Sequence, residues 1–506
     1  MLIRRLIPKE EGKRINLKVK VKDFGPISDG EITIKPLTIF IGPNNSGKSY
    51  AAVLIHSLFE SLTSSIPFGF FFKFLGESGI EYYSEYIDEL NKIVKGIEKK
   101  SGVDIPRQFV EKIFKQSLEK IFEKTLSKEI ARSYACPLNE LIRIDKSSFK
   151  LEIYYDSFQP PFNISLVYNK NDEEIKIEKL PQVDIKVKIN IVEPQQVPFT
   201  KSTRGVKISG NEIQFYLTKG KEIRKEILFE IVEVTLDFIY NKLRSLAVPS
   251  YYLPAARSGI LQGHRALAAG IIRRIPYVGI EKLPEIPPFS GVVSDFISSI
   301  LNLPEQKGHF YKLAQEFEKE IIKGEVVVRL FEEYLGPDIK YKFKDTEIPL
   351  HRSSSTVSEL APLFLYLKYN IKPGDILVIE EPEAHLHPQN QLILAKFLVR
   401  MIRNDIYVII TTHSEFLLEK LSNFIMLSKI EPEERKKRYK YSDNDFLKPD
   451  DVSVHVFGYD EESKGYKINK LEITEEDGIP QEEFLKVHEV LYEETFKIQK
   501  DLNAEP

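Results

Sequence analysis

The sequence predicts an α/β fold, because three apolar segments suited to buried strands each run into polar residues suited to one shared site. The first segment, 38–41, leads into a glycine-rich stretch and then into apolar residues at helical spacing. The second segment, 376–379, ends in two consecutive glutamates. The third, within 405–421, ends in two threonines and a histidine before another helical pattern begins. We therefore expect strands alternating with helices, with a site at the strand ends.

The glycine-rich stretch GPNNSGKS, at 42–49, has the spacing G-x-x-x-x-G-K-[ST] of a phosphate-binding loop. Such a loop lies between a strand and a helix N-terminus, where free backbone N–H groups and the helix dipole both favour an anion. Gly42 and Gly47 let the backbone curl around a phosphate without Cβ clashes. A glycine-rich turn that matches by chance is the alternative, and the order strand, loop, helix disfavours it. The predicted nucleotide-binding residues are Gly42, Pro43, Asn44, Asn45, Ser46, Gly47, Lys48, Ser49 and Tyr50.

Within this set, we expect Lys48 to reach the β- and γ-phosphates and the Ser49 hydroxyl to bind Mg²⁺. Of the two glutamates that end the second strand, Glu380 is the expected further ligand of Mg²⁺, usually through water. Glu381 is then placed to polarise the water that attacks the γ-phosphate. His413, after the third strand, is placed to contact the γ-phosphate and report its presence. The alternative for His413 is a solvated loop histidine.

Composition limits the class of protein. The chain has 506 residues, enough for two or three domains, and its 72 Lys and Arg nearly balance 75 Asp and Glu. A net charge of −3 argues against a wholly basic nucleic-acid binder but leaves room for a local basic channel. The single cysteine, Cys136, excludes a disulfide framework within one chain and fits a reducing cytosol. The first five residues are too short and too charged to begin a secretory signal, and the longest apolar patch, 66–76, is too short to span a membrane. We expect a cytoplasmic protein without a membrane partner.

Apolar periodicity changes along the chain. From 57 to about 130 the pattern is helical, and one face carries Phe109, Ile113, Phe114, Leu118, Ile121, Phe122 and Leu126. From 149 the period becomes two, which predicts antiparallel strands, and a helical pattern at about 221–245 closes this region. Residues 91–130 contain ten Lys or Arg and six Asp or Glu, a modest basic surplus that a solvated helix face also explains. The predicted divisions are an N-terminal head part at 1–60, an inserted helical and antiparallel-sheet lobe at 61–250, a C-terminal head part at 251–430 and a small extension at 431–506.

These motifs carry a resemblance to a known family. The order of the phosphate loop, SSSTVSEL at 353–360, LVIEEPEAHLHP at 377–388 and ITTHSEFLL at 410–418 resembles the ABC-type ATPase head shared by SMC proteins and OLD (overcoming lysogenisation defect) proteins. DFGPI at 23–27 and the phosphate loop resemble the opening of the OLD-like branch. The resemblance implies an ABC-type P-loop ATPase head with a large inserted α+β lobe, which binds ATP and Mg²⁺ and hydrolyses ATP.

The resemblance also implies partners. In this family the signature serine of one subunit caps ATP bound to the other, which closes a dimer of heads, and Ser355 matches that serine. We therefore expect a homodimer or higher oligomer. Thr356 stands where such signatures commonly have glycine, and Glu380 replaces the usual aspartate. Gln262 is a candidate for the family's Q-loop glutamine only by its place after an apolar strand.

OLD nucleases carry a Toprim domain with its own acidic cluster, and the last stretch of this chain resembles only a strand pair and a terminal helix. The chain resembles antiphage-defence ATPases such as those of Septu and PARIS systems, which implies a separately encoded nuclease. It is thus expected to be an ATP-driven switch that controls DNA or such an effector. The competing hypothesis is a self-contained metal nuclease that uses Glu383, His385 and His387, whose side chains suit Zn²⁺ or Mn²⁺. A transporter motor lacks any partner-coupling signal in this chain.

Overall fold

The structure is a computed structural model that describes residues 15–65, 83–95, 102–156, 161–182, 184–197, 205–219, 223–244, 246–263, 289–329 and 337–502. The apolar patch at 66–76 therefore lies outside the described residues. The chain divides into two compact units. Unit 1 comprises Met1–Asn16, Ser57–Ile130 and Lys150–Pro249, and unit 2 comprises Leu17–His56, Ala131–Phe149 and Ser250–Pro506.

Unit 2 is built on a large sheet in which the strands run in the order β11-β15-β16-β3-β17-β18-β2-β1. The first five are mutually parallel, β18 is antiparallel to β17, and β1 is antiparallel to β2. The strands of this sheet are β1 (Leu17–Phe24), β2 (Ile27–Ile34), β3 (Leu37–Ile41), β11 (Ser250–Leu253), β15 (Ile376–Glu380), β16 (Tyr407–Thr411), β17 (Val452–Asp460) and β18 (Gly465–Lys470). A separate antiparallel sheet contains β12 (Glu325–Arg329), β13 (Asp338–Phe343) and β14 (Thr346–Pro349).

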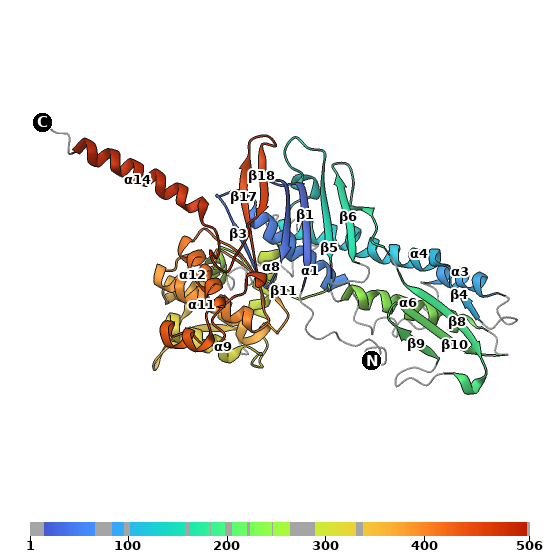
Figure 1. Cartoon of the computed structure of the whole chain (residues 1–506). Helices are drawn as coiled ribbons and strands as arrows, with labels where there is room; N and C mark the ends of the chain where they lie inside the picture. The colour runs from blue at the N-terminus through green and yellow to red at the C-terminus, as the bar shows by residue number, and fades with distance from the viewer. Residues whose placement is uncertain are drawn as a thin grey trace, which may run out of the picture. The chain divides into compact units, whose positions relative to one another are not determined.

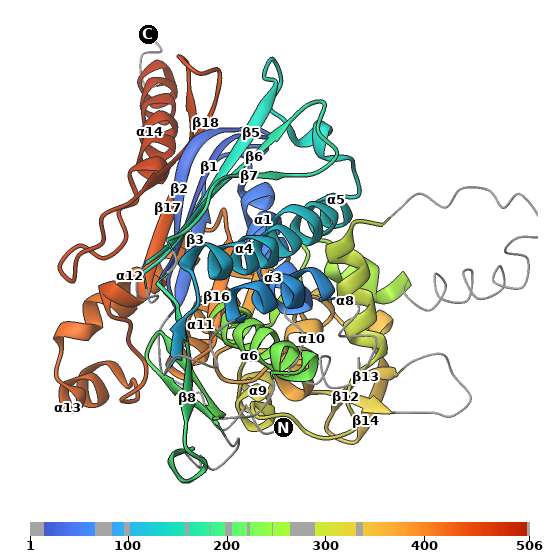
Figure 2. The ribbon, with the colours of Figure 1, turned by 90° about the vertical axis from the view of Figure 1, so that its right-hand side faces the viewer.

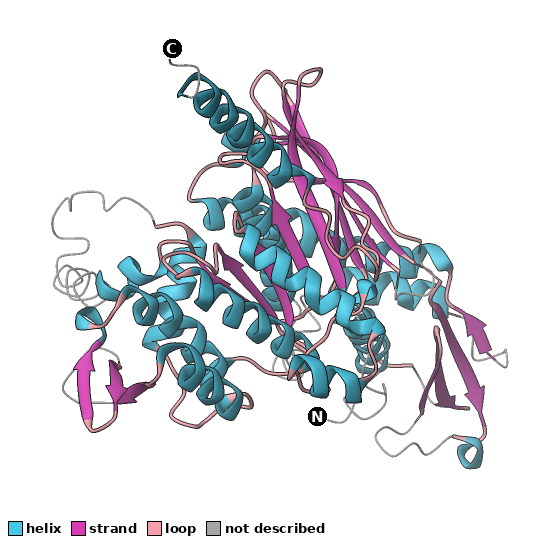
Figure 3. Ribbon diagram, turned by 60° about the vertical axis from the view of Figure 1, so that its left-hand side comes forward, coloured by secondary structure: helices cyan, strands magenta, loops and turns pink. Residues whose placement is uncertain are grey.

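The central strands form where the sequence is continuously apolar. Every residue of β3 and β16 is buried, as are the first four of β15, which is the pattern of parallel strands covered on both faces. Helices and strands alternate along this part of the chain (Figure 3), so the predicted α/β class is confirmed. The helices of unit 2 are α8 (Gly291–Leu301), α9 (Tyr311–Phe317), α10 (Ser355–Leu365), α11 (Pro388–Arg403), α12 (Glu415–Met426), α13 (Pro432–Glu434) and α14 (Glu482–Leu502).

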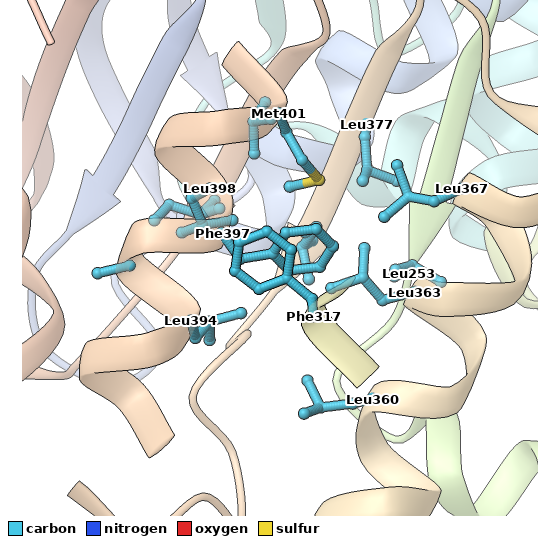
Figure 4. Close-up of a cluster of buried hydrophobic side chains, with 14 of the residues drawn as sticks. Leu253, Phe317, Leu360, Leu363, Leu367, Leu377, Leu394, Phe397, Leu398 and Met401 are labelled. Carbon is cyan, nitrogen blue, oxygen red and sulfur yellow. The ribbon is translucent and has the colours of Figure 1, made fainter. Parts of the chain in front are cut away.

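The core of unit 2 lies between these helices and the parallel strands. Figure 4 shows Phe317 and Phe397 facing each other between α9 and α11, with leucines from α10, β11 and β15 around them. Their rings are stacked, with centroids 3.8 Å apart and planes inclined by 29°. Met401 from α11 closes one side of the cluster. This packing fixes α10 and α11 against the strands whose ends carry the polar motifs.

The C-terminal part of the chain contributes to the same sheet. β17 pairs in parallel with β3 over Val452–Val456, so it lies beside the strand that leads into the glycine-rich loop (Figure 1). β18 then pairs with β17 and with β2. The segment after 430 therefore supplies two strands to the sheet of unit 2, followed by α14.

Unit 1 combines helices with a four-stranded sheet and with two strands, β6 and β7, that belong to the large sheet. The amphipathic helical face is confirmed, since all seven of its apolar residues are buried. Helices α3, α4 and α6 lie together (Figure 2). Its elements are α3 (Ser84–Val94), β4 (Gly102–Asp104), α4 (Arg107–Leu118), β6 (Phe162–Asn169), β7 (Lys176–Lys179), β8 (Lys186–Val192), β9 (Val206–Ser209), β10 (Glu212–Thr218) and α6 (Lys225–Arg244). Three elements have residues in both units: α1 (Lys48–Ser65), α5 (Leu126–Tyr134) and β5 (Ser148–Tyr155).

Strand pairing in unit 1 is only partly antiparallel. β6 and β7 are antiparallel as predicted. β8 is antiparallel to β4 but parallel to β10, so the expectation of antiparallel strands is wrong for that pair. An alternating pattern indicates which side chains face the core, and it does not contain the direction of the neighbouring strand. Among the described residues, no helix is both long enough and apolar enough to cross a membrane.

His455 on β17 makes the stability of unit 2 depend on pH. Its side chain is fully buried, its Nε2 accepts a hydrogen bond from the backbone N–H of Thr33 (3.2 Å), and Ser453 Oγ lies 2.7 Å from the same nitrogen. Burial lowers the pKa of His455 to about 4, against the opposing effect of the hydrogen bond with the Thr33 backbone and with a smaller lowering by Lys470. Between pH 4 and 6.5 the unfolded chain therefore binds a proton that the folded chain does not, so stability rises with pH over this window.

We predict that the free energy of unfolding falls by about 3 kcal/mol through this group as the pH is lowered from 6.5 to 4. His455→Gln, which cannot be protonated, should remove that slope in urea unfolding measured across this range. The matched control is His488→Gln, at a histidine whose side chain is 58% exposed. An unchanged slope in His455→Gln would contradict the assignment.

Candidate nucleotide-binding site

Three strand ends meet at one edge of the sheet of unit 2. In the parallel register, Phe40 of β3 lies opposite Thr411 of β16, and Thr411 lies opposite Glu380 of β15. The glycine-rich loop follows β3, and α1 begins at Lys48. Because parallel strands expose their carboxyl ends on the same side, the polar residues after all three strands occupy one edge.

The backbone of the glycine-rich loop has a conformation that side chains disfavour. Gly42 has φ +143°, Gly47 has φ +101°, and Asn45 between them has φ +63°. A Cβ on Gly42 would lie 2.6 Å from the backbone oxygen of Phe457 in β17. A Cβ on Gly47 would lie 2.9 Å from the side chain of Ile27, the last residue of DFGPI. Both glycines are therefore required by the strands that flank the loop as well as by its own curvature.

Lys48 lies across its own loop. Its Nζ donates hydrogen bonds to the carbonyl oxygens of Gly42 (2.9 Å) and Pro43 (2.7 Å), and the residue is only 6% exposed. Burial lowers the pKa of Lys48 to about 8, and the negative charges of Glu381 and Glu383 partly oppose this shift. The ammonium is thus held in a poorly hydrated position beside carboxylates, where an added anion would interact with it strongly.

The two glutamates after β15 are held differently. The side chain of Glu380 accepts a hydrogen bond from the backbone N–H of Ala255 (3.1 Å). Glu381 has a left-handed backbone, with φ +42°, and its N–H donates to the backbone oxygen of Thr411 (3.0 Å) and to Thr411 Oγ1 (3.2 Å). A non-glycine residue rarely has this conformation, so the surrounding contacts must impose it.

Glu383 organises the turn that carries His413. One carboxylate oxygen of Glu383 accepts hydrogen bonds from Thr412 Oγ1 (2.7 Å) and from the backbone N–H of His413 (2.9 Å). Burial raises the pKa of Glu383. The pKa of His413 is lowered by burial and then by the charge of Lys48, which favours a neutral imidazole beside the lysine. The structure thus brings together Lys48, Glu380, Glu381 and His413.

Ser355 is the first residue of α10, with its side chain exposed. The preceding Ser354 caps the helix by accepting a hydrogen bond from the N–H of Val357 (3.4 Å). Within the described residues, no hydrogen bond or ion pair joins Ser355 to Lys48, Glu381 or His413 of the same chain. Ser355 is therefore an exposed side chain at the positively polarised N-terminal end of a helix.

Tyr50 and Gln262, which the sequence suggests for the nucleotide site, lie in surroundings that differ from those of the residues above. Tyr50 packs its ring against Phe24 and Tyr134, at centroid distances of 6.3 and 5.3 Å, so its side chain belongs to an aromatic cluster at the start of α1. Gln262 is exposed within the helical residues 257–263. The segment after β11 instead meets Glu380 through the N–H of Ala255.

The metal-nuclease hypothesis lacks a preformed ligand set. Glu383 is engaged by the Thr412–His413 turn. His387 caps α11 by accepting a hydrogen bond from the N–H of Gln389 (3.3 Å), and His385 Nε2 lies 4.0 Å from Glu359. In the part of the chain that the structure describes, no group of three histidine, cysteine, aspartate or glutamate side chains converges as a metal site would require.

The residues at the strand ends fit a nucleotide and its magnesium ion. The loop backbone has the curvature of a phosphate cradle, and the Oγ of fully buried Ser46 has no hydrogen-bond partner among the described residues. Ser49 is exposed next to Lys48, and Glu380 lies at the neighbouring strand end. A hydroxyl and a carboxylate are oxygen donors of the kind that Mg²⁺ prefers.

Sequence reasoning missed one residue of this site. Arg257 follows β11 and is 1% exposed, and its guanidinium donates hydrogen bonds to the backbone oxygens of Glu380 and Glu381. The only signal in the sequence is an arginine among small and apolar residues directly after a strand, in YYLPAARSG.

Residues 17–418 match the protein family described as AAA ATPase domain. The chain belongs to this family. The matched AAA ATPase domain extends from β1 through the phosphate loop and the turn that carries His413 into α12. No curated protein matches the chain.

Similar solved structures are SMC heads. An SMC head bound to the C-winged helix domain of ScpA is 12% identical, with coverage of 92% of this chain and 99% of that chain, at a TM-score of 0.39. The SMC head domain from Thermotoga maritima is 13% identical, with coverage of 91% and 100%, at a TM-score of 0.32. An SMC head with an extended coiled coil, bound to the C-terminal domain of ScpA derived from Pyrococcus furiosus, is 11% identical, with coverage of 95% and 99%, at 0.38. At these low TM-scores, none of the three assigns a function to this chain.

We predict that Gly42→Ala weakens nucleotide binding at least tenfold, because its Cβ would strike the Phe457 oxygen and displace the loop or β17. The control is Gly458→Ala, one residue along β17, where an added Cβ meets nothing within 4 Å. Titration with a fluorescent ATP analogue distinguishes the two variants. Equal affinity in both would show that β17 does not constrain the loop.

Proposed function

We propose that this AAA ATPase domain protein is an ATP-binding and ATP-hydrolysing switch of the OLD/SMC-like ABC group, which closes as a dimer around ATP. The observation that carries the proposal is the register of β3, β16 and β15, which aligns the phosphate loop, His413 and the glutamate pair at one sheet edge. A phosphate cradle beside one carboxylate that can hold a metal ion and a second that can orient water is an arrangement suited to phosphoryl transfer to water.

In this proposal each side chain has a separate role. The loop N–H groups and Lys48 bind the β- and γ-phosphates, and Ser49 and Glu380 hold Mg²⁺, which neutralises developing phosphate charge. Glu381 accepts the proton of the attacking water as that water forms a bond to the γ-phosphorus and the bond to the ADP oxygen breaks. Neutral His413 contacts the γ-phosphate. The products are ADP and phosphate.

The dimer is supported by the exposed position of Ser355 at the start of α10. In the closed state Ser355 of one subunit caps the γ-phosphate bound to the other. Unit 1 carries the basic surplus of residues 91–130. Dimer closure would then change how unit 1 is presented to DNA or to a separately encoded nuclease. This use in genome defence or maintenance follows the family resemblance of the motifs.

We predict that Lys48→Ala loses measurable ATP binding and turnover, because the variant lacks the ammonium group that this proposal places on the β- and γ-phosphates. Lys396→Ala is the matched control. This lysine of α11 forms an ion pair with Glu320, with 3.2 Å between the charged atoms, and does not lie at the strand ends. Calorimetric titration with ATP and a phosphate-release assay measure both steps. ATPase activity of the wild-type level in Lys48→Ala would contradict the site assignment.

A second prediction concerns Glu381. Glu381→Gln retains the size of the side chain but loses the negative charge that polarises water, so turnover should fall on the order of 10²–10⁴-fold while ATP affinity barely changes. The stalled enzyme should accumulate as an ATP-bound dimer, seen as a gain in mass by light scattering.

Adding Ser355→Arg to that variant should disperse the dimer, because the bulky side chain cannot fit against phosphate across the interface. Glu433→Arg, in the first turn of α13, adds the same side chain to an exposed position and serves as the control. The dimer mechanism is wrong if Glu381→Gln gains no mass with ATP and Ser355→Arg changes nothing.

A further inference from the structure

A single buried arginine ties three parts of unit 2 together. Arg257 Nη1 donates to the backbone oxygens of Glu380 (2.7 Å) and Pro254 (3.3 Å), and its Nη2 donates to that of Glu381 (3.1 Å). Its Nε donates to the backbone oxygen of Glu359 in α10 (3.0 Å). The planar guanidinium thus serves four carbonyl groups at once, a pattern that no other side chain can reproduce.

The charge of Arg257 is balanced inside the protein. Its Nε lies 3.3 Å from a carboxylate oxygen of Glu359, and both side chains are 2% exposed. The other carboxylate oxygen of Glu359 accepts a hydrogen bond from Ser258 Oγ. A buried cation in contact with a buried carboxylate needs such pairing, since each charge has lost its hydration. The pair therefore couples the segment after β11 to α10.

Arg257 and Thr411 of β16 both form hydrogen bonds with the backbone of Glu381. On one side of Glu381, Thr411 accepts the backbone N–H. On the other side, Arg257 binds the carbonyl oxygens of Glu380 and of Glu381 itself. The peptide groups before and after Glu381 are thus fixed from two neighbouring strands, and the left-handed φ of +42° persists because these contacts over-determine it.

We propose that Arg257 is a positioning residue for ATP hydrolysis, which holds Glu381 in its left-handed backbone conformation so that the carboxylate meets the attacking water. The inference rests on the proposed role of Glu381. Arg257 itself touches no reacting atom. Since Glu359 lies one helical turn after Ser355, the same guanidinium also joins the helix that presents the signature serine to the turn that presents Glu381.

The test compares Arg257→Lys with Arg400→Lys. Lysine keeps the charge at position 257 but has one nitrogen in place of three, so it cannot serve the four carbonyl groups together. The control residue Arg400, in α11, is an arginine whose guanidinium instead binds the two carboxylate oxygens of buried Asp445, at 2.8 and 3.4 Å. We expect kcat to fall roughly 10²-fold in Arg257→Lys with the ATP dissociation constant unchanged, because misplacement by about 1 Å has that effect. Arg400→Lys should retain the kcat of the wild type per folded molecule.

A double-mutant cycle separates positioning from a general structural role. If Arg257 acts through Glu381, Arg257→Lys added to Glu381→Gln should reduce kcat no further, whereas independent effects would multiply. Multiplied losses, or a kcat in Arg257→Lys equal to that of Arg400→Lys, would overturn the inference. Should Arg257→Lys fail to fold, Ser258→Ala removes the hydrogen bond to Glu359 and is expected to lower kcat through the same residues, with the same cycle as its test.

Failure of the inference is distinguishable from failure of the proposed function. If Glu381→Gln hydrolyses ATP at the wild-type rate, the role of Glu381 is wrong, and the inference falls with it. If Glu381→Gln is inactive and Arg257→Lys is fully active, the proposed function stands and only the role of Arg257 is rejected.

Discussion

The parallel hydrogen-bonded register of β3, β16 and β15 is the constraint on which the site depends. It aligns Phe40 with Thr411 and Glu380, so two strand ends that follow Phe40 by more than three hundred positions in the chain lie at the same sheet edge. A slip of one residue in either pair would turn the side chain of Glu380 to the opposite face of the sheet. Both faces of these strands are buried, so a slip would also disrupt the close packing of their side chains against the neighbouring elements.

The conformation of the phosphate loop depends on neighbouring strands as well as on its own glycines. β17 crosses beside Gly42 at the backbone oxygen of Phe457, and Ile27 lies against Gly47. The loop is therefore enclosed by a strand from the N-terminal part of the chain and one from its C-terminal part. This enclosure explains how Lys48 remains nearly buried and hydrogen-bonded to loop carbonyl groups, with a pKa lowered by burial.

Much of this arrangement could be predicted from local sequence. The three apolar strands, the spacing of the phosphate loop and the buried helical face of unit 1 each depend on residues close together in the chain, whose pattern determines their structure. The parallel pairing of β8 with β10, the place of β17 beside β3 and the contacts of Arg257 depend on partners distant in sequence. Alternation and spacing contain no information about such partners, and a lone arginine after a strand is usually solvated.

The polar motifs differ in the hydrogen-bond partners that the fold gives them. Glu383 resembles a metal ligand in sequence, yet its oxygen is engaged by Thr412 and the N–H of His413, so it serves as a brace for the turn. Arg257 has no motif and is the most extensively engaged side chain beside the glutamate pair. Both side chains are charged groups removed from water, and a buried charge is stable only when hydrogen bonds or an opposite charge compensate for the lost hydration.

The most direct measurement of the central claim is a structure of the protein with Mg²⁺ and a non-hydrolysable ATP analogue. The account predicts that the β- and γ-phosphates lie in the loop 42–49 and that Lys48 Nζ leaves the carbonyl oxygens of Gly42 and Pro43 to contact them. A structure in which the nucleotide binds elsewhere, and Lys48 keeps both of those hydrogen bonds, would contradict it.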